Sequence, residues 1–144
     1  MGTVYWKQEG NEVDDNNVEI FRSYVEIDLR NQHLFLYTNS KLVGDWDIVS
    51  GTYTSRDRRT PAGIYRLTYK ERNAVLRGIG YESPVKYWMT FNRGIGMHDA
   101  SWRNKFGGRI YKYNGSHGCI NMPLDGAKAV YNAINSSYAI ICYD

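Results

Sequence analysis

Cys119 is the residue of this sequence best suited to covalent chemistry, and it lies in the segment YNGSHGCINMP (113–123). A thiolate attacks carbonyl carbon, so a reactive cysteine needs a neighbouring base or a positive field. His117 is only two residues away from Cys119, whereas His98 is remote in sequence, as the partner of a nucleophile usually is. Spacing alone leaves four interpretations of Cys119: a nucleophile, a zinc ligand with both histidines, half of a disulfide, or a small buried side chain.

The alternatives to a nucleophile have weak support in the sequence. Structural zinc usually takes four protein ligands, and no fourth cysteine or histidine is nearby. Two cysteines do not make a disulfide framework, and Cys142 lies in the apolar run YAIICYD (138–144), where we expect a buried and inert thiol. The glycines around Cys119, such as Gly118, suit a turn whose outward N–H groups hold an oxyanion.

Strands must position most of these residues. Apolar and polar residues alternate in YVEIDL (24–29), where Val25, Ile27 and Leu29 share one face, as in a half-buried strand. Further strands are expected at 33–38, 42–51, 64–70, 85–91, 94–98 and 138–144.

One helix and two loops complete the expected elements. The helix follows Pro123, since apolar residues then recur at a spacing of three and four. The segment 52–63 is expected to be a polar loop. Residues 71–85 show no clear period and include glycines and a proline, so we expect a long loop, and such loops are often lids or binding loops.

Composition indicates a single folded domain that begins near Tyr24. The chain has 144 residues with 42% apolar and 23% charged content, which is typical of globular proteins. Residues 7–19 are polar and aperiodic, so we expect 1–23 to be a linker or N-terminal extension. The net charge of +3 is too mild to indicate nucleic-acid binding, and no apolar run is long enough to span a membrane.

Several motifs together resemble the catalytic domain of the L,D-transpeptidases, the YkuD-like family. His98 is followed after seventeen residues by the run SHGCIN (116–121), which is similar to the signature of that family. TPAGIY (60–65), PVKYWMTFNRGIGMHDA (84–100) and YVEIDLRNQHLFLY (24–37) resemble other parts of it. The resemblance covers residues 24–144, and its combined motifs are highly specific.

The resemblance implies a mainly β fold with mixed sheets, sandwich-like or barrel-like, and one helix after the nucleophile loop. It also implies an enzyme that cross-links peptidoglycan stem peptides. Cys119 would attack the carbonyl of the third stem residue, release D-alanine and form a thioester. Attack by the side-chain amine of a second stem would give a 3→3 cross-link, and attack by water would give L,D-carboxypeptidase activity.

The resemblance also assigns roles to individual residues. His98 would be the base, oriented by a neighbouring backbone carbonyl, for which Asp99 is the best match. The remaining assignments are the oxyanion hole, formed by the N–H groups of His117, Gly118 and Cys119, and the residues that shape the loop or contact the substrate, which are Ser116, Asn121, Tyr87 and Trp88.

The expected partners are peptidoglycan stem peptides and, as covalent inhibitors, carbapenem β-lactams. No metal or cofactor is expected. Since such enzymes work outside the cytoplasm, we expect the bacterial cell envelope as the location and an N-terminal anchor or further domain in the parent protein. A wall-binding module that keeps the fold without turnover is the competing hypothesis, motivated by the 15% aromatic content and the mild positive charge.

Overall fold

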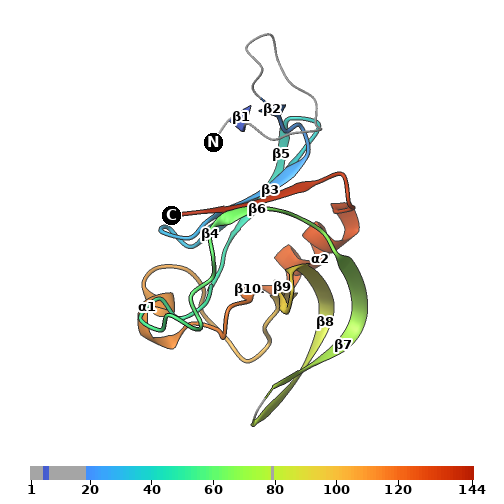
Figure 1. Cartoon of the computed structure of the whole chain (residues 1–144). Coiled ribbons are helices and arrows are strands. Elements are labelled where there is room, and N and C mark those ends of the chain that lie inside the picture. Colours follow the sequence, from blue (N-terminus) through green and yellow to red (C-terminus); the bar gives the residue numbers. More distant parts are fainter. Residues whose placement is uncertain (1–4, 7–18, 79) are drawn as a thin grey trace.

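Two mixed β-sheets form the body of the protein (Figure 1). The structure is a computed structural model that describes residues 5–6, 19–78 and 80–144. The first sheet has the order β5-β4-β3-β11-β6 and the second β10-β9-β8-β7, while β1 and β2 form a separate antiparallel pair. Its strands are β1 (Tyr5–Trp6), β2 (Glu19–Ile20), β3 (Tyr24–Asp28), β4 (His33–Thr38), β5 (Lys41–Asp47), β6 (Gly63–Arg66), β7 (Tyr69–Gly78), β8 (Tyr81–Asn92), β9 (Ile95–Asp99), β10 (Ile120–Met122) and β11 (Ala139–Tyr143), and its helices are α1 (Ile110–Asn114) and α2 (Leu124–Ala133).

Each main sheet contains one parallel pair of strands. In the first sheet, β11 runs parallel to β3 and antiparallel to β6. In the second, β10 runs parallel to β9, with Asn121 opposite His98. The parallel pairs are possible because long crossovers join their strands, and the crossover from β9 to β10 carries α1 and the cysteine loop.

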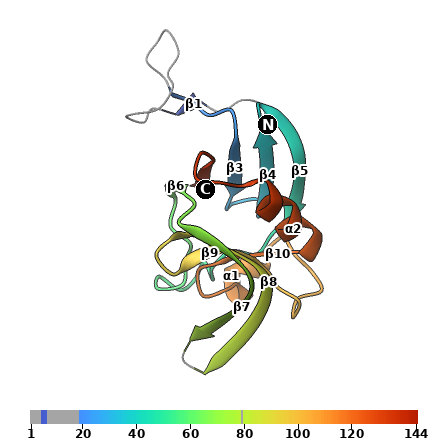
Figure 2. The ribbon, with the colours of Figure 1, turned by 90° about the vertical axis from the view of Figure 1, so that its right-hand side faces the viewer.

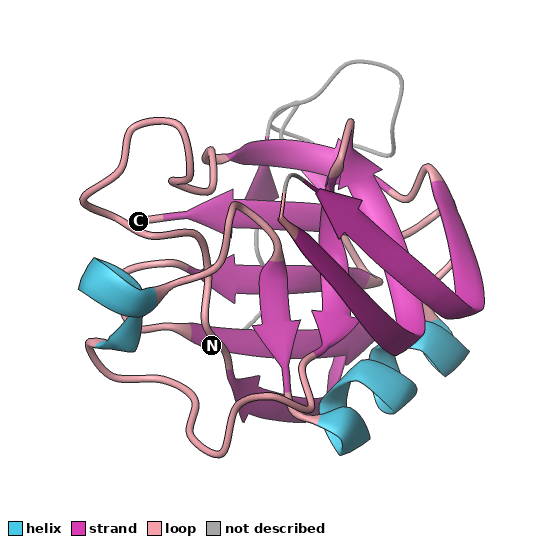
Figure 3. Cartoon of the chain, turned by 90° about the horizontal axis from the view of Figure 1, so that it is seen from below, coloured by secondary structure: helices cyan, strands magenta, loops and turns pink. Residues whose placement is uncertain are grey.

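One hydrophobic core joins the two sheets and α2. Figure 2 shows α2 beside the strands, and Figure 3 shows both helices at the periphery of the strands. α2 packs against β5, β8 and β9. Fully buried members of this core are Ile27, Leu36 and Ile140 from the first sheet, Met89, Met97 and Ile120 from the second, and Val130 from α2.

The predicted fold class is confirmed: the protein is mainly β with two mixed sheets, and the helix after Pro123 is present. The predicted long loop at 71–85 is wrong, because most of it belongs to the antiparallel hairpin β7–β8. Most side chains of β7 are exposed, and Ala74 is its one buried residue. A strand that is exposed on both faces has no period-two apolar signal, so the alternation test could not find it.

Two smaller features also differ from expectation. The five-residue helix α1 was not predicted, and its length is too short for a helical period to show. The third predicted strand, 42–51, is observed at Lys41–Asp47, and its register against β4 shifts between the pairs of Leu36 and Tyr37. This shift lies beside Gly44, the partner of Leu36.

Phe21, directly after β2, packs onto the first sheet. Phe21 is buried in a second cluster with Tyr24, Tyr37, Ala139 and Ile141. Of the predicted linker at 7–19, residues 7–18 lie outside the described residues, so the domain boundary near Tyr24 stays a prediction. No helix in the described ranges is long and apolar enough to cross a membrane.

Candidate active site

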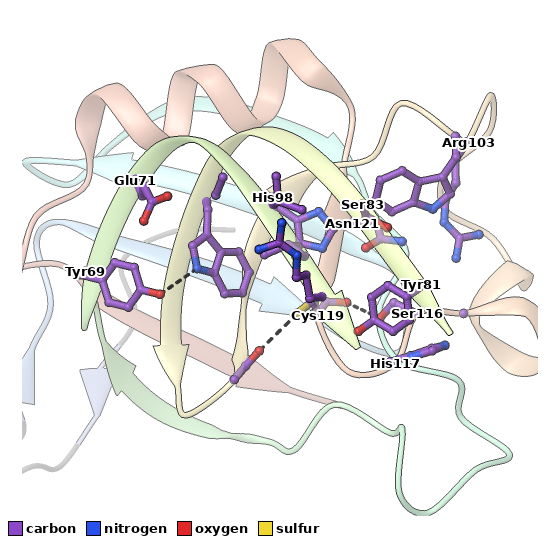
Figure 4. A pocket seen from close by; sticks show the side chains of 18 residues that line it. Tyr69, Glu71, Tyr81, Ser83, His98, Arg103, Ser116, His117, Cys119 and Asn121 are labelled. Carbon is purple, nitrogen blue, oxygen red and sulfur yellow. Dashed lines mark hydrogen bonds between the residues drawn. The ribbon is translucent and has the colours of Figure 1, made fainter. Parts of the chain in front are cut away.

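Strands β9 and β10 bring the predicted base and nucleophile into one pocket of about 480 Å³ (Figure 4). His98 lies on β9, and Cys119 comes directly before β10, the parallel neighbour of β9. The hairpin β7–β8 forms another wall of the pocket. The predicted site residues that line it are His98, Ser116, His117, Cys119, Asn121 and Trp88.

Backbone contacts from residues 49–52 hold the cysteine loop from behind. Ser116 pairs with Gly51 in an isolated bridge, and its N–H donates to the Ser50 carbonyl at 2.9 Å. The backbone of Asn121 exchanges hydrogen bonds with Val49. Gly115 is required here, because a Cβ at that position would lie 2.5 Å from the Ser50 oxygen. The position of the loop is therefore set by main-chain contacts.

Thr60 adds a side-chain tie to the same loop. Its buried Oγ1 accepts a hydrogen bond from the Gly51 N–H at 2.9 Å and donates one to the Gly118 carbonyl at 2.6 Å. Gly118 has a φ of +139°, a conformation that glycine adopts without strain. The TPAGIY element thus supports the cysteine loop through its first residue.

Cys119 is a half-buried, protonated thiol at neutral pH. Burial raises the pKa of Cys119 above its ordinary value, although a hydrogen bond with the Gly96 backbone opposes this shift. The thiol donates to the Gly94 carbonyl at 3.6 Å. A thiol in this state would need a base before it could attack a carbonyl carbon.

His98 is a buried, neutral base whose orientation is fixed. Its Nδ1 lies 2.7 Å from the Asp99 carbonyl oxygen. Since a carbonyl can only accept, Nδ1 carries the proton and Nε2 keeps its lone pair. Burial lowers the pKa of His98, which favours the neutral imidazole. The rings of Trp88 and Trp102 lie 5.8 and 5.9 Å from the imidazole ring.

The Asp99 side chain has a separate, structural task. Its carboxylate is buried and accepts hydrogen bonds from the backbone N–H groups of Lys86 and Tyr87, at 2.8 to 3.0 Å. These contacts tie β9 to β8 just beyond His98. The carboxylate thus fixes the strand whose carbonyl orients the imidazole.

The amides of the cysteine loop are not equivalent. The Gly118 N–H donates to Ser116 Oγ at 3.0 Å, and the same hydroxyl donates to the Cys119 carbonyl. The N–H groups of His117 and Cys119 donate to no acceptor in the part of the chain that the structure describes. Those two groups are available to an oxyanion, while Gly118 is occupied by Ser116.

The other predicted site residues fall into different surroundings. His117 is exposed, and its ring meets the Tyr81 ring edge-on at 5.0 Å, so it links the loop to the tip of the hairpin. Asn121 is buried, and its Oδ1 has no hydrogen-bond partner among the described residues. Trp88 lines the pocket, whereas Tyr87 packs in the core against Tyr131 of α2 and is not among the pocket residues.

The described residues contain no group of three or more side chains suited to hold a metal ion. Both cysteines are free, and burial raises the pKa of Cys142 to about 12. Sequence reasoning missed most of the remaining lining, because these residues belong to no recognisable catalytic motif. They include Glu71, Tyr81, Trp102 and Arg103.

The family model of the L,D-transpeptidase catalytic domain, YkuD, matches residues 22–141. The chain belongs to this family. It is 38% identical to a mutant L,D-transpeptidase of Enterococcus faecium in its crystal structure, with a TM-score of 0.78 over 85% of this chain and 50% of that one. The solution structure of the catalytic domain from E. faecium is 39% identical, with a TM-score of 0.73 over 84% of this chain and 96% of that domain.

A curated relative gives the same family. Probable L,D-transpeptidase 3 of Mycobacterium tuberculosis is 29% identical over 93 residues, which cover 57% of this chain and 33% of that protein. The chain thus matches about a third of the length of this curated relative. The similarity therefore covers the catalytic domain of these proteins.

Proposed function

We propose that this domain is a peptidoglycan L,D-transpeptidase, a cysteine acyltransferase in which Cys119 forms a thioester with the donor peptide. The observation that carries the proposal is a buried neutral His98, held through Nδ1 by the Asp99 carbonyl, in the same pocket as Cys119. His98 Nε2 takes the thiol proton as Sγ attacks the carbonyl carbon of the third stem residue.

The charge that develops on the carbonyl oxygen is stabilised by loop amides. The N–H groups of His117 and Cys119 would donate to this oxygen, since neither has a hydrogen-bond acceptor among the described residues. Loss of one such donor usually costs about 10²- to 10³-fold in rate. The Gly118 amide holds Ser116 Oγ, so the serine shapes the loop and Gly118 joins the oxyanion hole only if that bond breaks.

The imidazolium then protonates the departing amine, and D-alanine leaves. The thioester is open to a second amine, which loses its proton to His98 as it attacks. When the amine is the side chain of a second stem peptide, the product is a 3→3 cross-link, and when water attacks, the outcome is carboxypeptidase activity. The place of this reaction is the bacterial cell envelope, outside the cytoplasm.

The same thiol is expected to react with carbapenems. The E. faecium catalytic domain has been solved acylated by ertapenem, and it is 39% identical to this chain. Intact mass spectrometry after incubation with a carbapenem tests the proposal. We expect one adduct on the native protein, none on Cys119→Ala, and much slower addition to His98→Ala.

Cys142→Ala is the matched control, because it removes the other free thiol from the buried core. We expect it to form the adduct at the native rate. An adduct on Cys119→Ala, or none on the native protein, would refute the role of Cys119. If the adduct forms but purified tetrapeptide stems give neither cross-linked nor hydrolysed product, the wall-binding module becomes the better assignment.

A further inference from the structure

Arg103 is an unpaired cation in the wall of the catalytic pocket. Its side chain is half-buried, and one terminal nitrogen donates to the Asn114 carbonyl at 3.0 Å. Its Nε is buried and has no hydrogen-bond partner, and no carboxylate of the described residues forms an ion pair with it. A guanidinium offers five donors, so most of its hydrogen-bonding capacity is unused.

The surroundings of Arg103 disfavour its positive charge. Burial lowers the pKa of Arg103, and no acidic partner opposes that effect. The same positive charge acts on His98, where it adds to the effect of burial in lowering the pKa. A bound anion would compensate the guanidinium, and it would also make protonation of His98 easier during attack.

Among the described residues that line the pocket, Arg103 is the cation without an ion-pair partner. Arg77 also lines the pocket, but its Nε is paired with Glu82 at 3.0 Å. Glu71 lies on the opposite side of Cys119 from Arg103 (Figure 4), and it has no described ion-pair partner. The pocket therefore has an acidic side and a basic side, with the nucleophile between them.

We propose that Arg103 binds the C-terminal carboxylate of the donor peptide, the group that departs with D-alanine. This inference rests on the proposed function, because it takes the donor to be a stem tetrapeptide. In such a donor, only the amide nitrogen and one α-carbon separate the carboxyl group from the carbonyl that Cys119 attacks. A guanidinium in the wall of the same pocket, with free donors, suits a planar carboxylate.

This contact has two consequences for the reaction. A donor with one more residue would carry its carboxylate about 3.5 Å further along the chain, beyond the same contact, so Arg103 selects tetrapeptides over pentapeptides. Bound carboxylate also offsets the charge that acts on His98, so the correct donor strengthens the base that activates Cys119. Both effects end when D-alanine leaves with its carboxylate.

The test compares two donors that give the same thioester. One is a disaccharide-tetrapeptide with a free C-terminal carboxylate, and the other is its C-terminal carboxamide. The rate of Cys119 thioester formation is followed by intact mass. We expect the native protein to react about 10- to 100-fold faster with the free acid, the range for a hydrogen bond to a charged group.

Variants then assign this preference to one side chain. Arg103→Gln is expected to lose most of the preference by slowing only the reaction with the acid, and Arg103→Lys to recover part of it. Arg77→Gln is the matched control, since it removes a paired cation of the same pocket, and the native ratio is expected to persist. The ratio is measured within each variant, so partial unfolding of Arg103→Gln cancels.

Each outcome decides one of the two proposals. If the native protein acylates equally fast with both donors, or if Arg103→Gln keeps the native ratio, Arg103 does not read the carboxylate, and the proposed function stands. If neither donor forms a thioester on the native protein, the proposed function itself fails.

Discussion

Replacing Thr60 by valine tests whether the cysteine loop is held from behind. Valine has nearly the shape of threonine, so the substitution removes the hydroxyl and leaves the packing of the side chain nearly unchanged. The Gly51 N–H loses its acceptor and the Gly118 carbonyl loses a donor, which are bonds of 2.9 and 2.6 Å. Thr60 is 4% exposed, so water does not readily replace its hydroxyl.

The expected loss follows from these two contacts. A buried polar group left without a partner costs about 1–3 kcal/mol, so the loss of two partners in Thr60→Val should lower the free energy of unfolding by about 2–6 kcal/mol. For a domain of this size, each kcal/mol corresponds to roughly 2–4 °C in Tm. Chemical unfolding followed by tryptophan fluorescence measures the change.

The second readout is acylation of Cys119 by a carbapenem, corrected for the folded fraction. A freed Gly118 carbonyl lets the loop amides move, so Thr60→Val should acylate more slowly than the native protein. Thr60→Ser is the control that keeps the hydroxyl, and it should stay close to native in acylation rate. If Thr60→Val unfolds within about 0.5 kcal/mol of the native protein and acylates at its rate, the tie through Thr60 does not hold the loop.

Two further predictions concern His98 and Asp99. The rate of Cys119 acylation should decline as the pH falls through the lowered pKa of His98, below about 6.5, because a protonated imidazole cannot act as the base. The rate should not decline between pH 7 and 9, because the raised pKa of Cys119 keeps the thiol protonated at rest. A decline on the alkaline side would indicate a thiolate–imidazolium pair instead. Asp99→Asn turns one oxygen that accepts backbone N–H groups into a donor, so it should cost about 2–3 kcal/mol of unfolding free energy in urea. Its acylation rate per folded molecule should fall less than that of His98→Ala, since the backbone carbonyl of residue 99 remains; an equal fall would show that the carboxylate acts in the reaction.

The parts of the fold that the sequence predicted are those that contact the core. Apolar residues of β3 and of helix α2 recur at the period of the element, and β11 is a short apolar run that is buried on both faces. The local motif around Cys119 indicated the cysteine that lies in one pocket with His98. Together these signals suffice for the fold class, the helix and the residues that the pocket brings together.

The parts that the sequence did not predict depend on contacts between distant segments. The hairpin β7–β8 is stabilised by its ladder and by the small cluster of Ala74, Val85 and Trp88, and little apolar period marks it. Tyr87 and Trp88 are adjacent and both aromatic, yet the alternation of a strand sends one to the core and the other to the pocket. Arg103 belongs to no motif, and only the folded chain shows that no carboxylate of the described residues pairs with it.

Cys119 and His98 form hydrogen bonds with different backbone carbonyls and not with each other in this structure. The Cys119 thiol donates to the Gly94 carbonyl, and among the described residues no hydrogen bond joins it to His98. Since both groups are neutral, little attraction exists between them before the donor binds. Catalytic hydrogen bonds often form only in the substrate complex, so the proposed reaction requires the thiol to turn from Gly94 toward His98 Nε2 as the peptide enters. The rigid partners of this step are backbone groups: the Asp99 carbonyl that fixes the imidazole, and the main chain of residues 49–52 that fixes the loop. The sequence therefore indicates which side chains would react, while much of the geometry that positions them is set by main-chain atoms and by the Thr60 hydroxyl, whose contacts only the folded chain shows.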